Sequence, residues 1–113
     1  MPAAACQIRI LFCAPLNLGP GKIRLLEAIR EAGSIAGAAR TLHISYRRAW
    51  LMADALNKVF PQPLIDTAAG GVRGGGARLS ERGEAVLRCY RQMETKAAQA
   101  VSSEVEAMLA LAR

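Results

Sequence analysis

Thirteen residues, 38–50, constrain the fold more than any other part of the chain. They read Ala-Ala-Arg-Thr-Leu-His-Ile-Ser-Tyr-Arg-Arg-Ala-Trp. The two alanines allow a second helix to approach closely, Leu42 and Ile44 can anchor a turn in the core, and Ser45 can cap the following helix. We therefore expect a helix-turn-helix whose second helix points its first turn outward.

The neighbouring residues predict further helices. A helix over 22–32 carries its apolar residues on one face and ends at Gly33, which suits the position after a helix end. A second helix should run over 35–42 and a third over 46–59, where two prolines follow and stop it. His43, in the turn between them, is expected to tolerate an unusual backbone angle rather than to bind a ligand.

Three stretches have the pattern of strands. Residues 6–13 alternate apolar and polar side chains, which predicts an N-terminal strand. Residues 64–68 and 77–80 flank a glycine-rich tip and predict a β-hairpin, which directly after a helix-turn-helix makes a winged helix. The glycines of this wing are Gly70, Gly71, Gly74, Gly75 and Gly76. Their spacing matches neither of the common glycine-rich phosphate-binding loops, and a merely flexible loop is the other alternative.

A last helix is predicted to begin after Ser80 and to continue toward the chain end. Its apolar residues recur at spacings of three and four, as in a coiled coil with one stutter. The small domain can bury only the first turns of this stripe, so the remainder needs a second copy of the chain. The residues expected at that dimer interface are Met93, Ala97, Val101, Val105 and Met108. We expect a winged helix over 1–80 and a long dimerisation helix over 81–113, a mainly α fold with a small β-sheet.

The charge balance points to a polyanionic partner. The chain has 15 Lys and Arg against 9 Asp and Glu, a net charge of +6, and twelve of the basic residues are arginines. Ordinary solubility charge is the alternative. The residues expected to contact double-stranded DNA are Ser45, Tyr46, Arg47 and Arg48 in the major groove, and Arg73 and Arg78 on the wing. Trp50 either packs against a neighbouring element, which we favour, or lies beside DNA.

The sequence also argues against several classes of protein. No stretch is apolar and long enough to cross a membrane, and the start lacks the basic residues of a secretory signal, so we expect a cytoplasmic protein. Three cysteines without metal-site spacing and one histidine predict no metal and no cofactor. No paired carboxylates, Cys/His or Ser/His arrangement is present, so we expect no enzyme.

The motifs combine into a family resemblance. They are Gly33-Ser34-Ile35, then Ile-Ser-Tyr-x-x-Ala-Trp over 44–50, then Gly-Gly-x-x-Gly-Gly-Gly over 70–76. With them, residues 6 to about 110 resemble the N-terminal DNA-binding domain of the ModE-type molybdate-responsive transcriptional regulators. More distantly, they resemble the DNA-binding domain of LysR-type regulators. The resemblance implies a winged helix-turn-helix, an N-terminal strand beside the wing and a long dimerising helix.

One departure from the family limits what can be carried over. Full-length ModE-type regulators have molybdate-binding domains after the long helix, and this sequence ends at Arg113. We therefore expect no molybdate binding from this chain alone. The preferred interpretation is a bacterial, sequence-specific DNA-binding regulator that acts as a homodimer. The alternative is a winged-helix protein-interaction module that recruits a separate effector-sensing partner.

Overall fold

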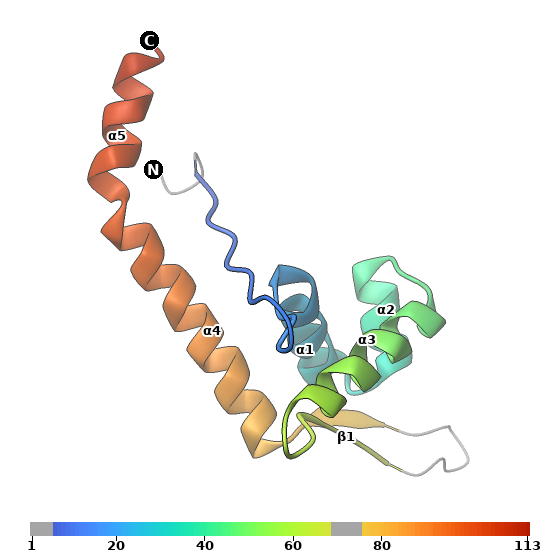
Figure 1. The fold of residues 1–113 in the computed structure, drawn as a ribbon. Coiled ribbons are helices and arrows are strands. Elements are labelled where there is room, and N and C mark those ends of the chain that lie inside the picture. Colours follow the sequence, from blue (N-terminus) through green and yellow to red (C-terminus); the bar gives the residue numbers. More distant parts are fainter. Residues whose placement is uncertain (1–5, 69–75) are drawn as a thin grey trace.

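The computed structural model describes residues 6–68 and 76–113 (Figure 1). Three helices come first, and a hairpin and two further helices follow. They are α1 (Pro20–Ala32), α2 (Ile35–Leu42), α3 (Tyr46–Val59), β1 (Ile65–Thr67), β2 (Ala77–Leu79), α4 (Glu81–Ala100) and α5 (Ser102–Leu111). The strands pair antiparallel, with Asp66 opposite Arg78. The predicted mainly helical winged helix-turn-helix is confirmed.

Local capping sets the helix boundaries, as the sequence predicts. The side chains of Ser34, Ser45 and Ser80 each accept a hydrogen bond from a backbone N–H three residues further on. Gly33 ends α1 and His43 ends α2, both in the left-handed region, with φ of 76° and 57°. The expected unusual backbone angle at His43 is confirmed.

The core lies around α1. This helix packs against α2, α3, β2 and α4. The largest fully buried side chains are Ile23, Leu25, Leu26 and Ile29 of α1, with Leu56, Leu64 and Tyr90 from the elements around it. A single core therefore holds the helix-turn-helix, the base of the hairpin and the first turns of α4 together.

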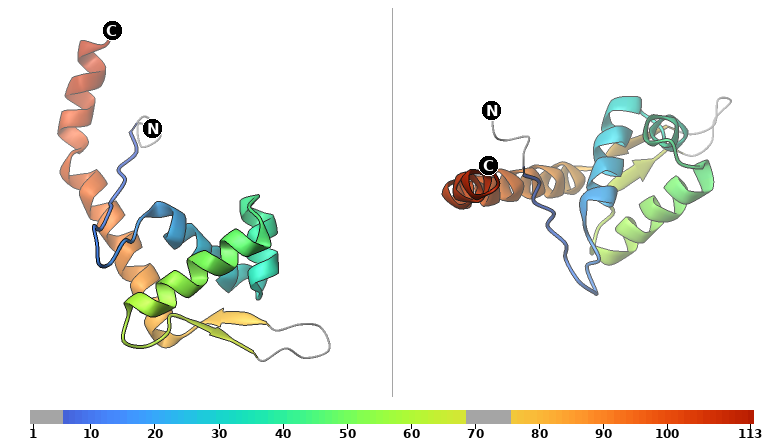
Figure 2. Two further views of the ribbon diagram at one scale, coloured as in Figure 1. Left: turned by 45° about the vertical axis from the view of Figure 1, so that its right-hand side comes forward. Right: turned by 90° about the horizontal axis from the view of Figure 1, so that it is seen from above.

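The N-terminal strand predicted over 6–13 is wrong. Within the described residues, this segment makes only one isolated bridge, between Phe12 and Leu18. It runs instead as an extended segment along α4, and the Tyr90 hydroxyl donates a hydrogen bond to the Ile10 carbonyl (Figures 1 and 2). Ile10 and Phe12 pack against the core. An extended chain that lays one face on a helix has the same two-residue period as a strand, but the helix offers it no backbone partner.

The C-terminal arm is two helices rather than the one predicted. α4 ends at Ala100, Val101 leaves helical geometry with φ −108° and ψ 9°, and α5 begins at Ser102. The Ser102 hydroxyl donates to the Gln99 carbonyl over 3.0 Å. A β-branched residue followed by two serines weakens a helix, because serine side chains compete for backbone hydrogen bonds. The arm gives the molecule a longest dimension of 58 Å.

Candidate nucleic-acid interface

The first turn of α3 is held in place by the opposite face of the same helix. Ala49, Ala53 and Leu56 are buried in the core. Tyr46, Arg47 and Arg48 are all exposed, as the helical-face argument predicts. The turn reads Tyr-Arg-Arg-Ala, so its side chains carry positive charge only. This charge adds to the positive end of the helix dipole.

Ser45 has a structural task at this site. Its hydroxyl oxygen accepts a hydrogen bond of 3.0 Å from the Arg48 N–H and so fixes where α3 begins. The amides of Tyr46 and Arg47 precede the first helical hydrogen bonds, as in any helix. The start of α3 therefore offers backbone donors and arginine side chains at one exposed point, an arrangement suited to phosphate.

Asn57 fixes the hairpin to α3, a role that the sequence argument missed. Its side-chain Nδ2 donates to the Ile65 carbonyl over 3.0 Å, and its Oδ1 accepts from the Leu64 and Ile65 N–H groups at 2.9 and 3.0 Å. One amide thus satisfies three backbone groups at the base of β1. The only signal in the sequence is an asparagine in the last turn of a helix, and that does not identify its partner.

The hairpin and the start of α3 extend toward the same end of the molecule, away from α4 (Figure 2). Arg78 is exposed on β2, and its cross-strand partner is Asp66. The Ala77 N–H donates to the Gly33 carbonyl over 2.9 Å, so the tip-side end of the paired strands rests on the turn between α1 and α2. Gly76 lies just before β2 at this tip-side end, where its carbonyl accepts a hydrogen bond from the Ala68 N–H over 2.9 Å. Gly70, Gly71, Gly74, Gly75 and Arg73 lie outside the described residues.

Trp50 is exposed over 45% of its surface, which does not match the packed position that we favoured. With Tyr46, Arg47 and Leu51 it lines a shallow hollow of about 330 Å³ on the outer side of α3. The next acidic group on this helix, Asp54, forms an ion pair of 2.9 Å with Lys58. The outer side of α3 is therefore both cationic and apolar.

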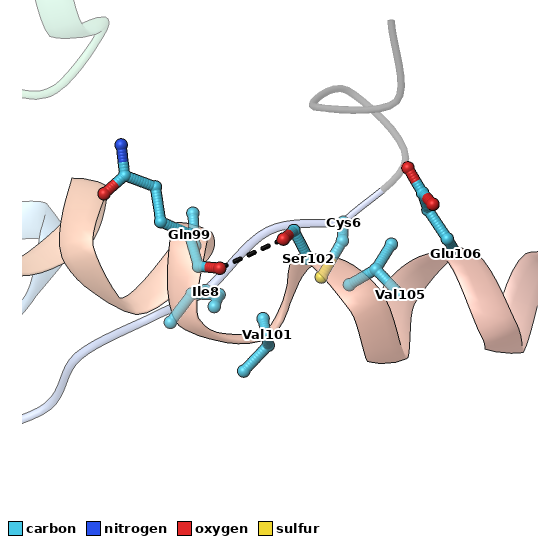
Figure 3. Close-up of a pocket in the computed structure, with 8 residues that line it drawn as sticks. Cys6, Ile8, Gln99, Val101, Ser102, Val105 and Glu106 are labelled. Carbon is cyan, nitrogen blue, oxygen red and sulfur yellow. Dashed lines mark hydrogen bonds between the residues drawn. The ribbon is translucent and has the colours of Figure 1, made fainter.

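The expected dimer residues lie along the arm. Met93, Ala97, Val101 and Val105 are half-buried, and Met108 is 67% exposed. The chain's own N-terminal segment covers part of this stripe. Cys6 and Ile8 line a groove of about 340 Å³ together with Val101 and Val105 (Figure 3).

Other arginines are engaged in the body of the molecule. Arg91 forms ion pairs with Glu94 at 2.8 Å and with Glu27 of α1 at 2.7 Å, and these bonds raise its pKa. Burial, followed by the nearby carboxylate of Glu94, raises the pKa of the Tyr90 hydroxyl. The ion pair between Arg91 and Glu27 joins α4 to α1.

Within residues 6–68 and 76–113, no group of three His, Cys, Asp or Glu side chains could hold a metal ion. The helices in the described part of the chain are also too short or too polar to cross a membrane.

The chain matches a known family of proteins. The model of the bacterial regulatory helix-turn-helix proteins of the lysR family matches residues 21–84. The chain is 46% identical over 78 residues to the molybdenum-pterin-binding protein MopA of Rhodobacter capsulatus. It is 43% identical over 77 residues to the molybdenum transport protein ModE of Azotobacter vinelandii, and 39% over 79 residues to the transcriptional regulator ModE of Haemophilus influenzae. These alignments cover 69%, 68% and 70% of this chain, but only 29%, 28% and 31% of the relatives.

Solved structures agree with the fold. The DNA-binding domain of CbnR, solved in complex with DNA, superposes with a TM-score of 0.60 at 25% identity, over 78% of this chain and 95% of that one. ArgP of Mycobacterium tuberculosis superposes with a TM-score of 0.54 at 24% identity, over 75% of this chain and 30% of that one. With the exposed, arginine-bearing start of α3 and the hairpin beside it, these matches lead to one conclusion: the chain belongs to the lysR family of bacterial regulatory helix-turn-helix proteins.

Proposed function

We propose that the chain is a sequence-specific DNA-binding transcription regulator that acts as a homodimer. The observation that carries this proposal is the first turn of α3, where Arg47 and Arg48 are exposed beside Tyr46 and the cap Ser45. In a major groove, an arginine can pair bidentately with guanine or grip a phosphate, and the helix start adds amide donors. Such a regulator works by occupying its site and acts in the cytoplasm, without catalysis.

The wing supplies the second set of proposed contacts. Arg78, with Arg73 and the wing glycines, is assigned to the backbone or minor groove next to the site of α3. The shared direction of the hairpin and the start of α3 supports this assignment (Figure 2). Contacts of this kind position a protein on the duplex more than they select a sequence.

The DNA assignment is tested with two arginine variants of equal charge change. Arg47→Ala should cost about 1–3 kcal/mol on a selected site and relax the base preference if the side chain reads guanine. A purely phosphate contact would weaken all sequences alike and lower the salt slope by about one. The matched control is Arg88→Ala, which removes an exposed arginine from α4. Equal losses for both variants would mean that only net charge matters and would refute the assignment.

We assign the dimer interface to the apolar stripe of the arm, from Met93 to Met108. The exposure of Met108 and the half-exposure of Val101 and Val105 support a partner there, because buried apolar area stabilises association by about 25 cal/mol per Å². A two-fold dimer would present two copies of α3 to successive major grooves, roughly 34 Å apart. On this assignment, residues 1–80 bind DNA and residues 81–113 dimerise.

Dimerisation is tested by sedimentation at micromolar concentration. Val105→Asp should dissociate the dimer and weaken operator binding while the winged helix stays folded. Ala107→Asp places the same charge on an exposed position of α5 outside the stripe and serves as the control. A monomeric wild type, or an unchanged dimer in Val105→Asp, would mean that the stripe serves its own domain.

The names of the relatives refer to molybdenum, so we also predict how this chain responds to molybdate. These 113 residues should show no saturable molybdate binding in calorimetry and no change of DNA affinity when molybdate is added. Binding at micromolar concentration would contradict that prediction.

A further inference from the structure

An apolar patch lies exposed on the proposed DNA-reading helix. Among the described residues, large hydrophobic side chains are exposed in the N-terminal segment, along α5 and on α3. Those of α3 are Tyr46 at 57%, Trp50 at 45% and Leu51 at 48%. The core face of this helix is already complete with Ala49 and its buried neighbours, so the fold itself does not require the patch.

The surroundings of the patch indicate what covers it. Arg47 lines the same hollow, Arg48 follows directly, and Asp54 is already paired with Lys58. A second copy of this surface would bring like charges together, and charges without partners are costly in a buried contact. A polyanion that also carries apolar groups would match both the positive charge and the apolar side chains of the patch. The DNA duplex that is proposed to lie against the arginines is such a molecule.

Thymine offers the one apolar group on the base edges of the major groove, its C5 methyl. Arg47 and Leu51 are four residues apart on α3, a rise of roughly 6 Å. That rise is close to two base steps of roughly 3.4 Å each. An arginine that holds a guanine would therefore bring Leu51, and beside it Trp50, to the methyl groups of thymines one or two steps away.

We propose that Trp50 and Leu51 read thymine methyl groups next to the base pair contacted by Arg47, and so select thymine-containing half-sites. This inference rests on the proposed DNA binding and adds a specificity that the arginines cannot supply.

The experiment removes the methyl group alone. Half-sites are first selected from random duplex DNA with the full chain, and each thymine of the selected site is then replaced by uracil. The wild type should lose about fourfold in affinity for each methyl that it contacts, the factor expected for burying one CH₂-sized group. In Trp50→Ala and in Leu51→Ala, uracil in place of the thymine that the removed side chain contacts should no longer weaken binding. Trp50 is the only tryptophan, so its fluorescence gives a second readout of burial against DNA.

Two controls separate this inference from the proposed function. Leu11→Ala shortens another exposed leucine and should keep the full preference for thymine, and Arg47→Ala should bind more weakly but keep part of it. Equal wild-type binding to both duplexes, selected half-sites without thymine, or an undiminished preference in both patch variants would overturn the inference while leaving DNA binding intact. The patch would then belong to a protein partner. A wild type that binds no duplex at all would overturn the proposed function and this inference together.

Discussion

Replacing Gly83 with alanine should loosen the joint between the hairpin and α4. A Cβ atom at this position would lie 2.2 Å from the Leu64 carbonyl oxygen and 3.3 Å from the Leu79 Cβ. Real Cβ atoms essentially never approach other atoms within 3.0 Å, so the helix or the Leu64 backbone must move by about 0.8 Å. That carbonyl accepts hydrogen bonds from the Ser80 N–H at 2.9 Å and from the Ser80 hydroxyl at 3.2 Å, so the movement also strains the cap of α4.

The magnitude follows from two opposing effects. Overpacking against backbone costs about 1–3 kcal/mol, and the loosened hydrogen bonds add about 1 kcal/mol. Alanine in place of glycine in a helix returns about 0.5–1 kcal/mol. We expect a net loss of about 1–3 kcal/mol, measured by urea denaturation. Gly21→Ala is the matched control, because a Cβ there meets nothing within 4 Å, and it should be neutral or slightly stabilising. A Gly83→Ala protein as stable as the wild type would refute the reasoning.

Three further substitutions test hydrogen bonds and backbone geometry on which the fold depends. Asn57→Ala leaves two N–H groups and a carbonyl at the base of β1 without their partner and should cost about 2–4 kcal/mol in denaturation; a cost below about 0.5 kcal/mol would contradict it. The pKa of the Tyr90 hydroxyl is higher in the folded chain than in the unfolded chain, so the folded chain holds this proton up to a higher pH. Tyr90 therefore stabilises the fold fully below about pH 10, and this contribution is lost as pH rises through the folded pKa. Unfolding free energies at about pH 8 and pH 11 should therefore differ less in Tyr90→Phe than in the wild type, and an equal difference would exclude the tyrosine as the cause. His43→Gly removes a side chain from the left-handed region and should change stability by no more than about 1 kcal/mol in either direction, since relief of strain opposes the greater freedom of the unfolded glycine; a larger loss would show that the imidazole has a packing role.

Features encoded by neighbouring residues could be predicted from the sequence. The starts of α2, α3 and α4 follow from serine caps that bond three residues ahead, and the end of α1 follows from Gly33. The outward face of α3 follows from helical periodicity alone, so the exposure of Tyr46, Arg47 and Arg48 was predictable as well.

Features that depend on distant partners could not be predicted. Asn57 is informative only once the hairpin lies beside it. The segment 6–13 has the period of a strand, but it faces a helix. The break at Val101 depends on how strongly the local residues favour a helix and on serine side chains that compete for backbone hydrogen bonds. The heptad spacing of the apolar residues contains no information about either. In the candidate site, the arginines could be selected from the sequence because of their charge and position. The hollow around Trp50 could not, because it is formed by four side chains whose relative positions only the structure gives.

The contact between the N-terminal segment and α4 has a consequence for the order of folding. Ile10 and Tyr90 are 80 residues apart in the chain, whereas α1, α2 and α3 contact one another across short turns. During synthesis, α1, α2 and α3 can contact one another once they have left the ribosome, but residues 6–10 meet their partners on the C-terminal arm only after it has emerged. Closing a loop of this length costs about 4 kcal/mol of chain entropy, which the ordered three-helix body partly removes in advance. Residues 6–10 are therefore expected to reach their final position after the three helices that follow them in the chain.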